Sequence, residues 1–302
     1  MTTPTQLVTS AKTLLFVPGN RPERFAKAAA AGAHLVVLDL EDAVPLPEKE
    51  AARAAVGGWL TAGHVAAVRI NAADTSEFEA DVAMVAEHDC VVMVPKAEEP
   101  DVLVRLDSRL SEGSGMVALV VETAQGVLNA AALAAAACVD RLAFGSFDLA
   151  AQLGVDPADR LAMASARSAL VLASAAAGIA APIDGVSGAI GDEMALRSDT
   201  DHALRLGFTG KLCIYPSQVA FVDEALSPTA EQIAWAQKVV GAAGSSGGVV
   251  VVDGRMVDKP VIIRARRLLA ASGHDQPQHQ TTSIKDGAAP APGRSEKRDR
   301  HA

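Results

Sequence analysis

The stretch Val117–Gly126 reads Val-Ala-Leu-Val-Val-Glu-Thr-Ala-Gln-Gly, and it indicates how the rest of the chain folds. Five apolar residues in a row, three of them Val, are typical of a strand that is buried on both faces, as in a parallel sheet. The run ends at Glu122, and Thr123 is then a suitable N-cap for the Ala-rich helix that follows. Glu122 is therefore expected at the carboxyl end of a strand, the edge where α/β proteins assemble active sites.

A second carboxylate follows the next apolar run. Residues 141–144 form that run, and the chain continues Gly145-Ser146-Phe147-Asp148. Two adjacent strands would bring Glu122 and Asp148 to one edge, and carboxylate oxygens are the ligands that Mg²⁺ prefers. The alternative is that Glu122 caps a helix and Asp148 is a solvated loop acid. These residues alone leave both interpretations open.

The same alternation of short apolar runs and Ala-rich segments repeats from Thr13 onward. Strands are expected near residues 13–17, 35–39, 66–70, 91–94, 117–121, 141–144, 180–183 and 210–214. Helices are expected near 22–32, 48–61, 77–87, 99–110, 124–136, 158–177, 189–206 and 217–226. About eight such units predict an α/β fold of the (β/α)8 TIM-barrel type. A doubly wound open sheet is the alternative, although no Gly-x-Gly-x-x-Gly motif follows the first strand.

The chain has four expected regions. A flexible N-terminus covers residues 1–12, and the barrel covers residues 13–227. Residues 228–272 predict a small extension, with a helix after Pro228, a Gly/Ser-rich break, a hairpin at Asp253-Gly254 and a final helix near 261–272. Residues 273–302 are rich in Gln, Pro, Ser and charge, which is typical of a disordered tail.

Composition narrows the class of protein. The 302 residues are 50% hydrophobic and only 3% aromatic, so Ala, Val and Leu must fill most of the core. A net charge of −9 argues against a nucleic-acid partner. The three cysteines form no metal or disulfide pattern, the N-terminus lacks a signal-peptide core, and no apolar run approaches the ~18 residues of a membrane span. We therefore expect a cytoplasmic protein that binds neither nucleic acid nor membrane.

Polar side chains follow most of the other expected strands. Arg69 ends the third strand, where it would either pair with nearby acids or hold a substrate carboxylate with both arms of its guanidinium. The substrate role is favoured, because this edge has more acids than internal ion pairs need. Lys96 follows the fourth strand, either as an ion-pair partner of Asp42 or Glu122 or as a site residue. Asp184 follows the seventh strand.

Basic residues recur at the start of the first expected helix. Arg21, Arg24 and Lys27 stand three residues apart, and Pro22 lies near the first helical position. Such a stripe beside a helix N-terminus suits phosphate groups. The alternative is a solvated helix face, which the spacing alone favours.

Eight short segments, most of them at expected strand ends, carry a family resemblance: Leu15–Pro22, Leu38–Val44, Val68–Asn71, Val94–Lys96, Val121–Thr123, Phe144–Leu149, Lys211–Gln218 and Asp253–Pro260. In their order and spacing they resemble the citrate lyase β-subunit-like acyl-CoA lyases of the HpcH/HpaI aldolase superfamily, which include malyl-, citramalyl- and citryl-CoA lyases. The resemblance covers roughly residues 13–272.

The resemblance implies a TIM barrel whose C-terminal extension packs on a neighbouring subunit of a homotrimer or homohexamer. It implies Mg²⁺ held by Glu122 and Asp148, with Arg69 holding the carboxylate of a 2-oxo acid or of the acyl-CoA. Asp258 matches an acid that some relatives lend across the subunit interface as a general base. The implied coenzyme A contacts fall on the first βα turn and favour the phosphate interpretation there: Pro18, Asn20, Arg21 and Arg24.

The expected function is Mg²⁺-dependent cleavage, or the reverse condensation, of a 3-hydroxyacyl-CoA of the malyl-, citramalyl- or citryl-CoA type. The expected partners are acyl-CoA and 2-oxo acid small molecules. The alternatives are a thioesterase on malyl-CoA-type esters, a 2-oxo acid aldolase that needs no coenzyme A, and a CoA-ester-binding subunit of a larger lyase complex. Tyr215, where relatives commonly have His, and the Gly-rich segment Pro182–Asp192 depart from the family pattern and bear on the substrate.

Overall fold

The structure is a computed structural model that describes residues 3–119, 122–188, 190–245 and 250–272. Residues 120 and 121, which end the strand expected near 117–121, lie outside the described residues, and so does the expected tail at 273–302. The chain divides into two compact units between Ser227 and Pro228, and each unit is described by itself.

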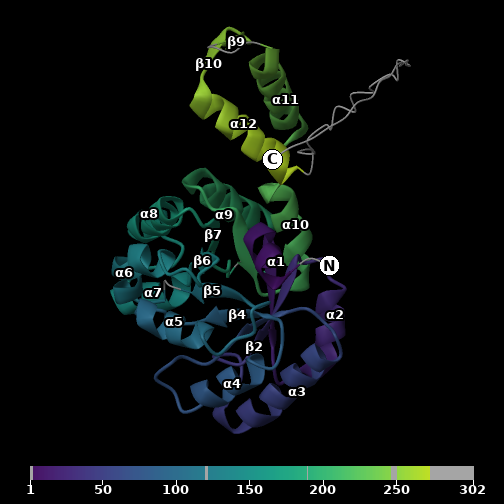
Figure 1. Ribbon diagram of the computed structural model, residues 1–302, viewed down its shortest axis with the longest axis vertical. Helices are drawn as coiled ribbons and strands as arrows, with labels where there is room; N and C mark the ends of the chain where they lie inside the picture. Colours follow the sequence, from purple (N-terminus) through teal and green to yellow (C-terminus); the bar gives the residue numbers. More distant parts are fainter. Residues whose placement is uncertain (1–2, 120–121, 189, 246–249, 273–302) are drawn as a thin grey trace, which may run out of the picture. The chain divides into compact units, whose positions relative to one another are not determined.

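Eight parallel strands close into a barrel in chain order, with β8 paired to β1 (Figure 1). They are β1 (Thr13–Pro18), β2 (Leu35–Asp39), β3 (Ala67–Arg69), β4 (Val91–Val94), β5 (Gly115–Leu119), β6 (Arg141–Ala143), β7 (Ala180–Asp184) and β8 (Gly210–Cys213). The pairing of the first strand with the last confirms the predicted TIM barrel and excludes the open sheet. The strands lie where the sequence predicted them, except that β5 begins at Gly115 rather than Val117.

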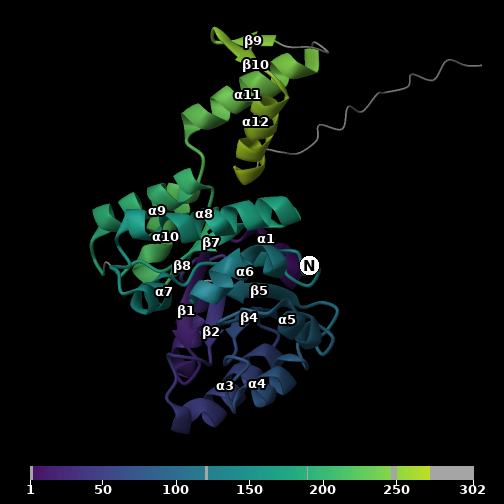
Figure 2. The same ribbon diagram turned by 90° about the vertical axis from the view of Figure 1, so that its left-hand side faces the viewer.

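Helices surround these strands on the outside of the barrel (Figures 1 and 2). The helical elements after β1 are η1 (Pro22–Arg24), α2 (Phe25–Ala29), η2 (Leu46–Glu48), α3 (Lys49–Thr61), α4 (Phe78–Val85), α5 (Pro100–Asp107), α6 (Ala124–Ala134), α7 (Ser146–Leu153), α8 (Arg160–Ala177), α9 (Glu193–Leu206) and α10 (Pro216–Leu226). The long helix expected near 22–32 is a 3₁₀ turn and a five-residue α-helix instead. None of the described helices is both long and apolar enough to cross a membrane.

Alternate strand residues pack on the two sides of the barrel wall, as the two-residue period of a strand requires. Leu14, Val37 and Met93 belong to the cluster that fills the interior. Leu15 and Leu38, one position along, belong to the larger cluster between the strands and the helices. Both sides of the wall are therefore apolar, which explains the uninterrupted hydrophobic runs in the sequence.

The N-terminal segment is a helix, which corrects the expectation of a flexible segment. Helix α1 (Pro4–Ser10) begins at a capping box, in which Thr3 and Gln6 exchange hydrogen bonds with each other's backbone. Val8 is fully buried in the cluster that fills the barrel interior. The sequence did not indicate this helix, because seven mostly polar residues carry no apolar repeat, and its stability comes from burial of Val8 and Ala11.

The second unit pairs two helices with a hairpin (Figure 2). Helices α11 (Ala230–Ser245) and α12 (Lys259–Ala271) pack around buried Ala236, Val239 and Val257. Strands β9 (Val250–Val252) and β10 (Arg255–Val257) are antiparallel. Asp253 and Gly254 form the turn with φ of +48° and +74°, the left-handed conformation expected of an Asp-Gly hairpin.

Candidate functional site at the carboxyl ends of the strands

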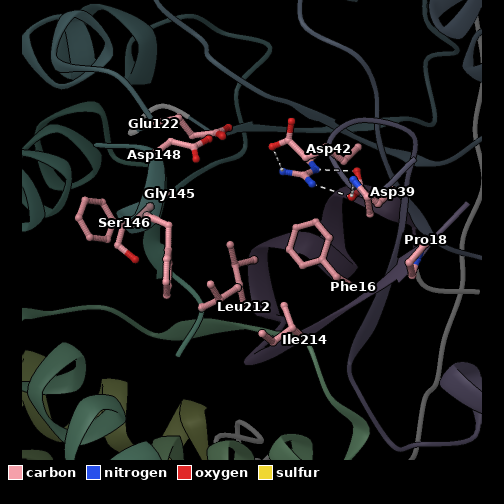
Figure 3. Close-up of a pocket in the computed structure, with 15 residues that line it drawn as sticks. Phe16, Pro18, Asp39, Asp42, Glu122, Gly145, Ser146, Asp148, Leu212 and Ile214 are labelled. Carbon is pink, nitrogen blue, oxygen red and sulfur yellow. Dashed lines mark hydrogen bonds and ion pairs between the residues drawn. The ribbon is translucent and has the colours of Figure 1, made fainter. Parts of the chain in front are cut away.

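A cavity of about 420 Å³ opens at the carboxyl ends of the barrel strands (Figure 3). Its walls come from the ends of β1, β2, β3 and β8 and from residues that follow β2, β5, β6, β7 and β8. The lining residues that matter for chemistry are Pro18, Asp39, Asp42, Arg69, Glu122, Ser146 and Asp148, and the apolar remainder includes Phe16, Phe144, Phe147 and Leu212. Three residues predicted for metal or substrate binding, Arg69, Glu122 and Asp148, therefore share one cavity.

Arg69 makes a two-pronged ion pair with Asp39 on the neighbouring strand. Its Nε lies 2.7 Å from Asp39 Oδ1 and its Nη2 lies 2.6 Å from Asp39 Oδ2. The β2–β3 register places these two residues side by side. The third nitrogen, Nη1, lies 3.0 Å from Glu41 Oε2. Although burial opposes the charged form, the hydrogen bonds of Asp39 and the charges of Asp39 and Glu41 raise the pKa of Arg69, so it stays protonated.

This pairing bears on the two roles that the sequence left open for Arg69. Asp39 occupies one edge of the guanidinium, so a substrate carboxylate cannot use that edge unless the pair breaks. The Nη1 and Nη2 atoms have further hydrogens, and Arg69 lines the cavity. The ion pair thus orients the guanidinium, and its outer edge, where Nη1 already faces Glu41 Oε2 at 3.0 Å and Asp42 Oδ2 at 3.9 Å, keeps hydrogens for a ligand.

Glu122 is buried beside another carboxylate. Its side chain is only 5% exposed, and Figure 3 shows its carboxylate next to that of Asp148. Burial, the Asp148 carboxylate and the charge of Glu41 together raise the pKa of Glu122 to about 9. Thr123 is the N-cap of α6, accepting a hydrogen bond from Gly126 N at 3.0 Å. The alternative in which Glu122 caps that helix is therefore wrong.

Asp148 is not a loop residue, because α7 begins at Ser146 and Asp148 lies in its first turn. This helix was not expected from the sequence. The position suits a carboxylate, since the unpaired backbone N–H groups of a helix N-terminus favour negative charge. The helix start also fixes the direction in which the Asp148 side chain leaves the backbone, toward Glu122 (Figure 3).

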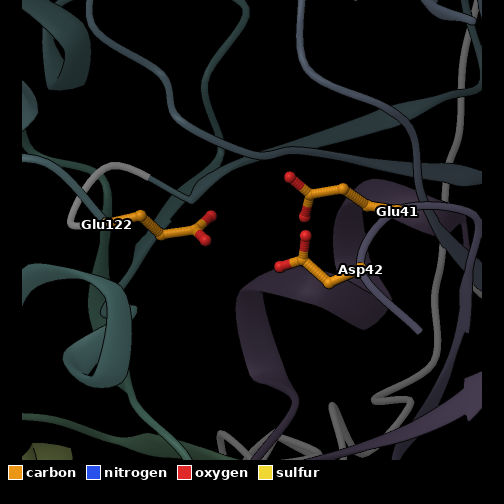
Figure 4. Close-up of side chains that lie close together, drawn as sticks. All are labelled: Glu41, Asp42 and Glu122. Carbon is orange, nitrogen blue, oxygen red and sulfur yellow. The ribbon is translucent and has the colours of Figure 1, made fainter. Parts of the chain in front are cut away.

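Two further acids, Glu41 and Asp42, belong to the site, and neither was predicted to bind the metal or the substrate. Glu41, Asp42 and Glu122 each bring one carboxylate oxygen to a group whose atoms all lie within 4.8 Å of one another (Figure 4). Burial raises the pKa of Glu41 despite the opposing charge of Arg69 and Lys96. A sequence signal existed, since Asp39, Glu41 and Asp42 are three acids within four residues at the end of a fully buried strand.

The loop that carries these acids is fixed by its own hydrogen bonds. Asp39 accepts hydrogen bonds from Glu41 N at 2.9 Å and Ala43 N at 3.2 Å. Lys49 Nζ donates to the backbone oxygens of Leu40 and Glu41, both at 2.7 Å. On the other side, Gly19 lets the first βα turn approach closely, because a Cβ there would lie 2.9 Å from Asp39 O. The acidic loop is therefore held in place before any ligand binds.

Lys96 forms an ion pair, but not with the partners proposed from the sequence. Its Nζ lies 2.6 Å from Glu41 Oε1 rather than against Asp42 or Glu122. Its backbone N donates a longer bond, 3.4 Å, to Glu122 Oε1. Although partial burial disfavours the ammonium, the hydrogen bond and charge of Glu41 raise the pKa of Lys96.

The residues predicted to contact coenzyme A are only partly brought to the cavity. Pro18 lines it, whereas Asn20 Nδ2 donates to Glu48 Oε2 at 2.6 Å. Arg21 Nε lies 2.9 Å from Glu23 Oε1 and Arg24 Nε lies 3.8 Å from the same oxygen. Both arginine side chains are about half exposed. Their guanidinium groups therefore face solvent at the first βα turn, and each forms a weak, exposed ion pair with Glu23.

Two other predicted residues lie outside the cavity lining. Asp184 ends β7 but is fully buried, where it pairs with Arg167 Nε at 3.0 Å and Lys211 Nζ at 2.9 Å. It therefore belongs to a structural ion-pair network rather than to the polar edge expected from the sequence. Asp258 lies in the second unit, where it is the N-cap of α12 and accepts a hydrogen bond from Val261 N at 3.3 Å.

The fold and the site define a class: a TIM-barrel protein with a buried carboxylate cluster and a fixed arginine at the carboxyl ends of its strands. Residues 12–216 match the model of the HpcH/HpaI aldolase/citrate lyase family. The chain belongs to this family.

Several known proteins resemble this chain in sequence and structure over most of its length. A citrate lyase subunit beta-like protein of Mycobacterium tuberculosis is 39% identical over 266 residues, covering 86% of this chain and 94% of the relative. A (3S)-malyl-CoA thioesterase of Cereibacter sphaeroides is 35% identical over 277 residues, covering 86% and 93%. The M. tuberculosis protein CitE in complex with magnesium, acetoacetate and coenzyme A has a TM-score of 0.75 at 36% identity, covering 88% of this chain and 99% of CitE. A CitE structure with magnesium and pyruvate has a TM-score of 0.68 at 34% identity, with coverage of 86% and 99%.

Proposed function

We propose that this protein is a Mg²⁺-dependent carbon–carbon lyase that cleaves, or forms, a 3-hydroxyacyl-CoA thioester of the malyl-, citramalyl- or citryl-CoA type. The observation that carries the proposal is the buried Glu122 carboxyl, which shares a cavity with Asp148 and Arg69. Family membership supports it, because the similar CitE structures hold magnesium together with small acids and coenzyme A.

The donor set fits Mg²⁺. Glu122 and Asp148 would hold the ion, and both offer only hard carboxylate oxygens. The raised pKa of Glu122 arises from burial and from crowding with Asp148 and Glu41, and a cation between the carboxylates would relieve that crowding. When bound, the ion would supply Lewis-acid polarisation of the substrate oxygens.

Arg69 would hold the carboxylate of the 2-oxo acid product, or the matching group of the acyl-CoA, with the edge that Asp39 leaves free. Its fixed positive charge also suits the negative charge that develops during carbon–carbon cleavage. Pro18, Asn20, Arg21 and Arg24 would contact the coenzyme A portion. The weak pairs of Arg21 and Arg24 with Glu23 are exposed, so phosphate groups could replace them at little cost.

The general base in this proposal is Asp258 of an adjacent subunit, in a homotrimer or homohexamer whose extensions pack on their neighbours. Asp258 takes the proton of the substrate hydroxyl, and the electrons of that O–H bond form the carbonyl of the 2-oxo acid. The carbon–carbon bond breaks, its electron pair leaves as the acyl-CoA enolate, and the enolate then takes up a proton.

A hydrolytic outcome is the second candidate, because one of the similar relatives is a (3S)-malyl-CoA thioesterase. In that reaction water cleaves the thioester and no carbon–carbon bond breaks. The same metal and arginine would serve both reactions, so the distinction lies in the products.

The test is a panel of 3-hydroxyacyl-CoA esters with the purified chain, with and without Mg²⁺. From malyl-CoA we expect acetyl-CoA and glyoxylate, formed only when Mg²⁺ is present. Free CoA with malate would instead establish the thioesterase. Full activity in the presence of a chelator would contradict the metal assignment, and release of a 2-oxo acid from substrates without CoA would indicate a CoA-independent aldolase.

We expect Asp258→Asn to lower turnover about 100-fold, because asparagine cannot accept the hydroxyl proton. The side-chain oxygen of Asn caps helices about as well as that of Asp, so the thermal midpoint should stay unchanged. Asp253→Asn, in the neighbouring hairpin turn, is the matched control and should keep wild-type turnover. An Asp258→Asn protein with wild-type kcat would exclude Asp258 as the base.

A further inference from the structure

Lys96 has an unusual backbone conformation at the edge of the site. Its φ is +44°, and Asp253 is the only other non-glycine residue in the described part of the chain with a positive φ. The hairpin turn accounts for Asp253, but Lys96 lies two residues after the end of β4, with Pro95 between, and is in no hairpin. Left-handed conformations are unfavourable for lysine and persist only where the surroundings hold them, often at functional sites.

The side chain of Lys96 pairs with one carboxylate oxygen of Glu41, and Arg69 pairs with the other. Lys96 Nζ lies 2.6 Å from Glu41 Oε1, while Arg69 Nη1 lies 3.0 Å from Glu41 Oε2. Glu41 is only 5% exposed, whereas the side chain of Lys96 is 39% exposed, so water screens the Lys96 contact more than the Arg69 contact. One buried carboxylate is thus shared between a cation on the β3 strand and a cation that follows β4.

Lys96 does not touch the cavity that Arg69 and Glu122 line. Among the described residues, those that line this cavity do not include Lys96, which borders two neighbouring cavities instead. A direct contact with the substrate in the main cavity is therefore not its role. Its influence must pass through Glu41, and to a smaller extent through its backbone N–H toward Glu122.

We propose that Lys96 is a positioning residue: its left-handed backbone directs the ammonium onto Glu41 Oε1, which keeps Glu41 from closing further on the outer edge of Arg69, where Glu41 Oε2 already lies 3.0 Å from Nη1 and where the substrate carboxylate must bind. This inference rests on the proposed function. Without the ammonium, Arg69 is the cation that remains paired with the Glu41 carboxylate among the described residues, and Glu41 binds it more fully. Removing a cation also strengthens the negative field of Asp42 and Glu122 around the incoming substrate.

The test compares Lys96→Asn with Lys96→Arg. Asparagine tolerates the left-handed conformation but lacks the ammonium, whereas arginine restores a cation. Lys96→Gly removes the side chain with no backbone cost and provides a second variant if Asn fails to fold. Arg109→Asn is the matched control, since it removes an exposed pair at 2.8 Å between Arg109, just beyond the end of α5, and Glu79 in α4.

Calorimetry with pyruvate in the presence of Mg²⁺ measures binding without turnover, and steady-state kinetics measures KM and kcat separately. We expect Lys96→Asn and Lys96→Gly to weaken pyruvate binding and raise KM about tenfold, as loss of one charged hydrogen bond predicts. We expect a smaller loss in kcat, an unchanged thermal midpoint, and recovery of most of the KM in Lys96→Arg.

Wild-type pyruvate affinity in both Lys96→Asn and Lys96→Gly would overturn the positioning role and leave the proposed function intact. Equal loss of kcat and binding in all three variants, Lys96→Arg included, would also overturn it, because the ammonium would then not be the active feature. A wild-type protein that binds no pyruvate with Mg²⁺ and turns over no thioester would overturn the proposed function, and this inference with it.

Discussion

Glu122→Gln is expected to lower Mg²⁺-dependent turnover by at least about 1,000-fold, which corresponds to about 4 kcal/mol of lost transition-state stabilisation. The amide has nearly the shape of the carboxyl, so the cavity should keep its form. It has no negative charge to offer a cation, and the remaining proposed ligand, Asp148, is exposed to solvent. A single exposed carboxylate holds a divalent ion weakly.

The same substitution should stabilise the protein when no cation is present. The pKa of Glu122 rises from an ordinary value of 4.5 to about 9 on folding, so between these pH values the folded state holds a proton that the unfolded state has lost. The free energy of unfolding contributed by Glu122 therefore falls as the pH rises through this window. Glu122→Gln has no such proton, and near pH 8 without Mg²⁺ it should unfold at a higher temperature than the wild type.

Two measurements check this pair of expectations. Turnover of the best substrate at saturating Mg²⁺ tests the ligand role, and thermal unfolding in a chelator between pH 5 and 9 tests the buried carboxyl. Mg²⁺ should raise the midpoint of the wild type and not that of the variant. Glu112→Gln, an exposed acid, is the control and should change neither. A variant that keeps wild-type turnover, or one less stable than the wild type at every pH, would contradict the assignment.

The barrel was predictable from sequence because its strands are buried on both faces. Most of the strands are short apolar runs, and β2 is buried at every position, so hydrophobicity alone located it. Helices α1 and α7 were not predictable in the same way. Helix α1 is held by the barrel interior and α7 by the turn after β6, and neither carries a long amphipathic repeat. Tertiary contacts decide such short helices.

The sequence indicated which residues lie together at the strand ends of the site, but not which of them form ion pairs with one another. Because parallel strands end at one edge, Arg69, Glu122 and Asp148 could be brought together from their positions in the sequence. Which acid forms the ion pair with Arg69 depends on the β2–β3 register, and no local sequence pattern specifies that register. Lys96 pairs with Glu41 rather than with Asp42 or Glu122, and this depends on the left-handed backbone of Lys96 itself. A lysine in the sequence does not indicate that conformation.

Arg141→Ala is expected to lower the free energy of unfolding by about 3 to 5 kcal/mol. Arg141 is the first residue of β6 and is only 1% exposed. Its guanidinium donates to Ala11 O and Ala181 O, both at 2.6 Å, and to Val8 O at 2.9 Å. These bonds tie the end of α1 to the base of the barrel, and burial lowers the pKa of Arg141 without removing its charge at neutral pH.

The alanine variant loses both the donors and the volume of the side chain. The carbonyl groups would then be buried without hydrogen-bond partners, each at a cost of about 1 to 3 kcal/mol. Arg141→Met fills most of the space and removes the cost of burying a charge, so it should fall between the wild type and Arg141→Ala. Urea unfolding gives this order, and amide exchange should show faster exchange over residues 4–11 in both variants.

Arg197→Met is the matched control, because its pair with Glu224 at 2.7 Å is exposed on both sides. Such a pair contributes little, so the control should stay within about 0.5 kcal/mol of the wild type. If Arg141→Ala matched the control, the buried guanidinium would not hold α1 to the barrel. If Arg141→Met were as stable as the wild type while exchange over residues 4–11 rose, packing would hold the barrel and the hydrogen bonds would hold only α1.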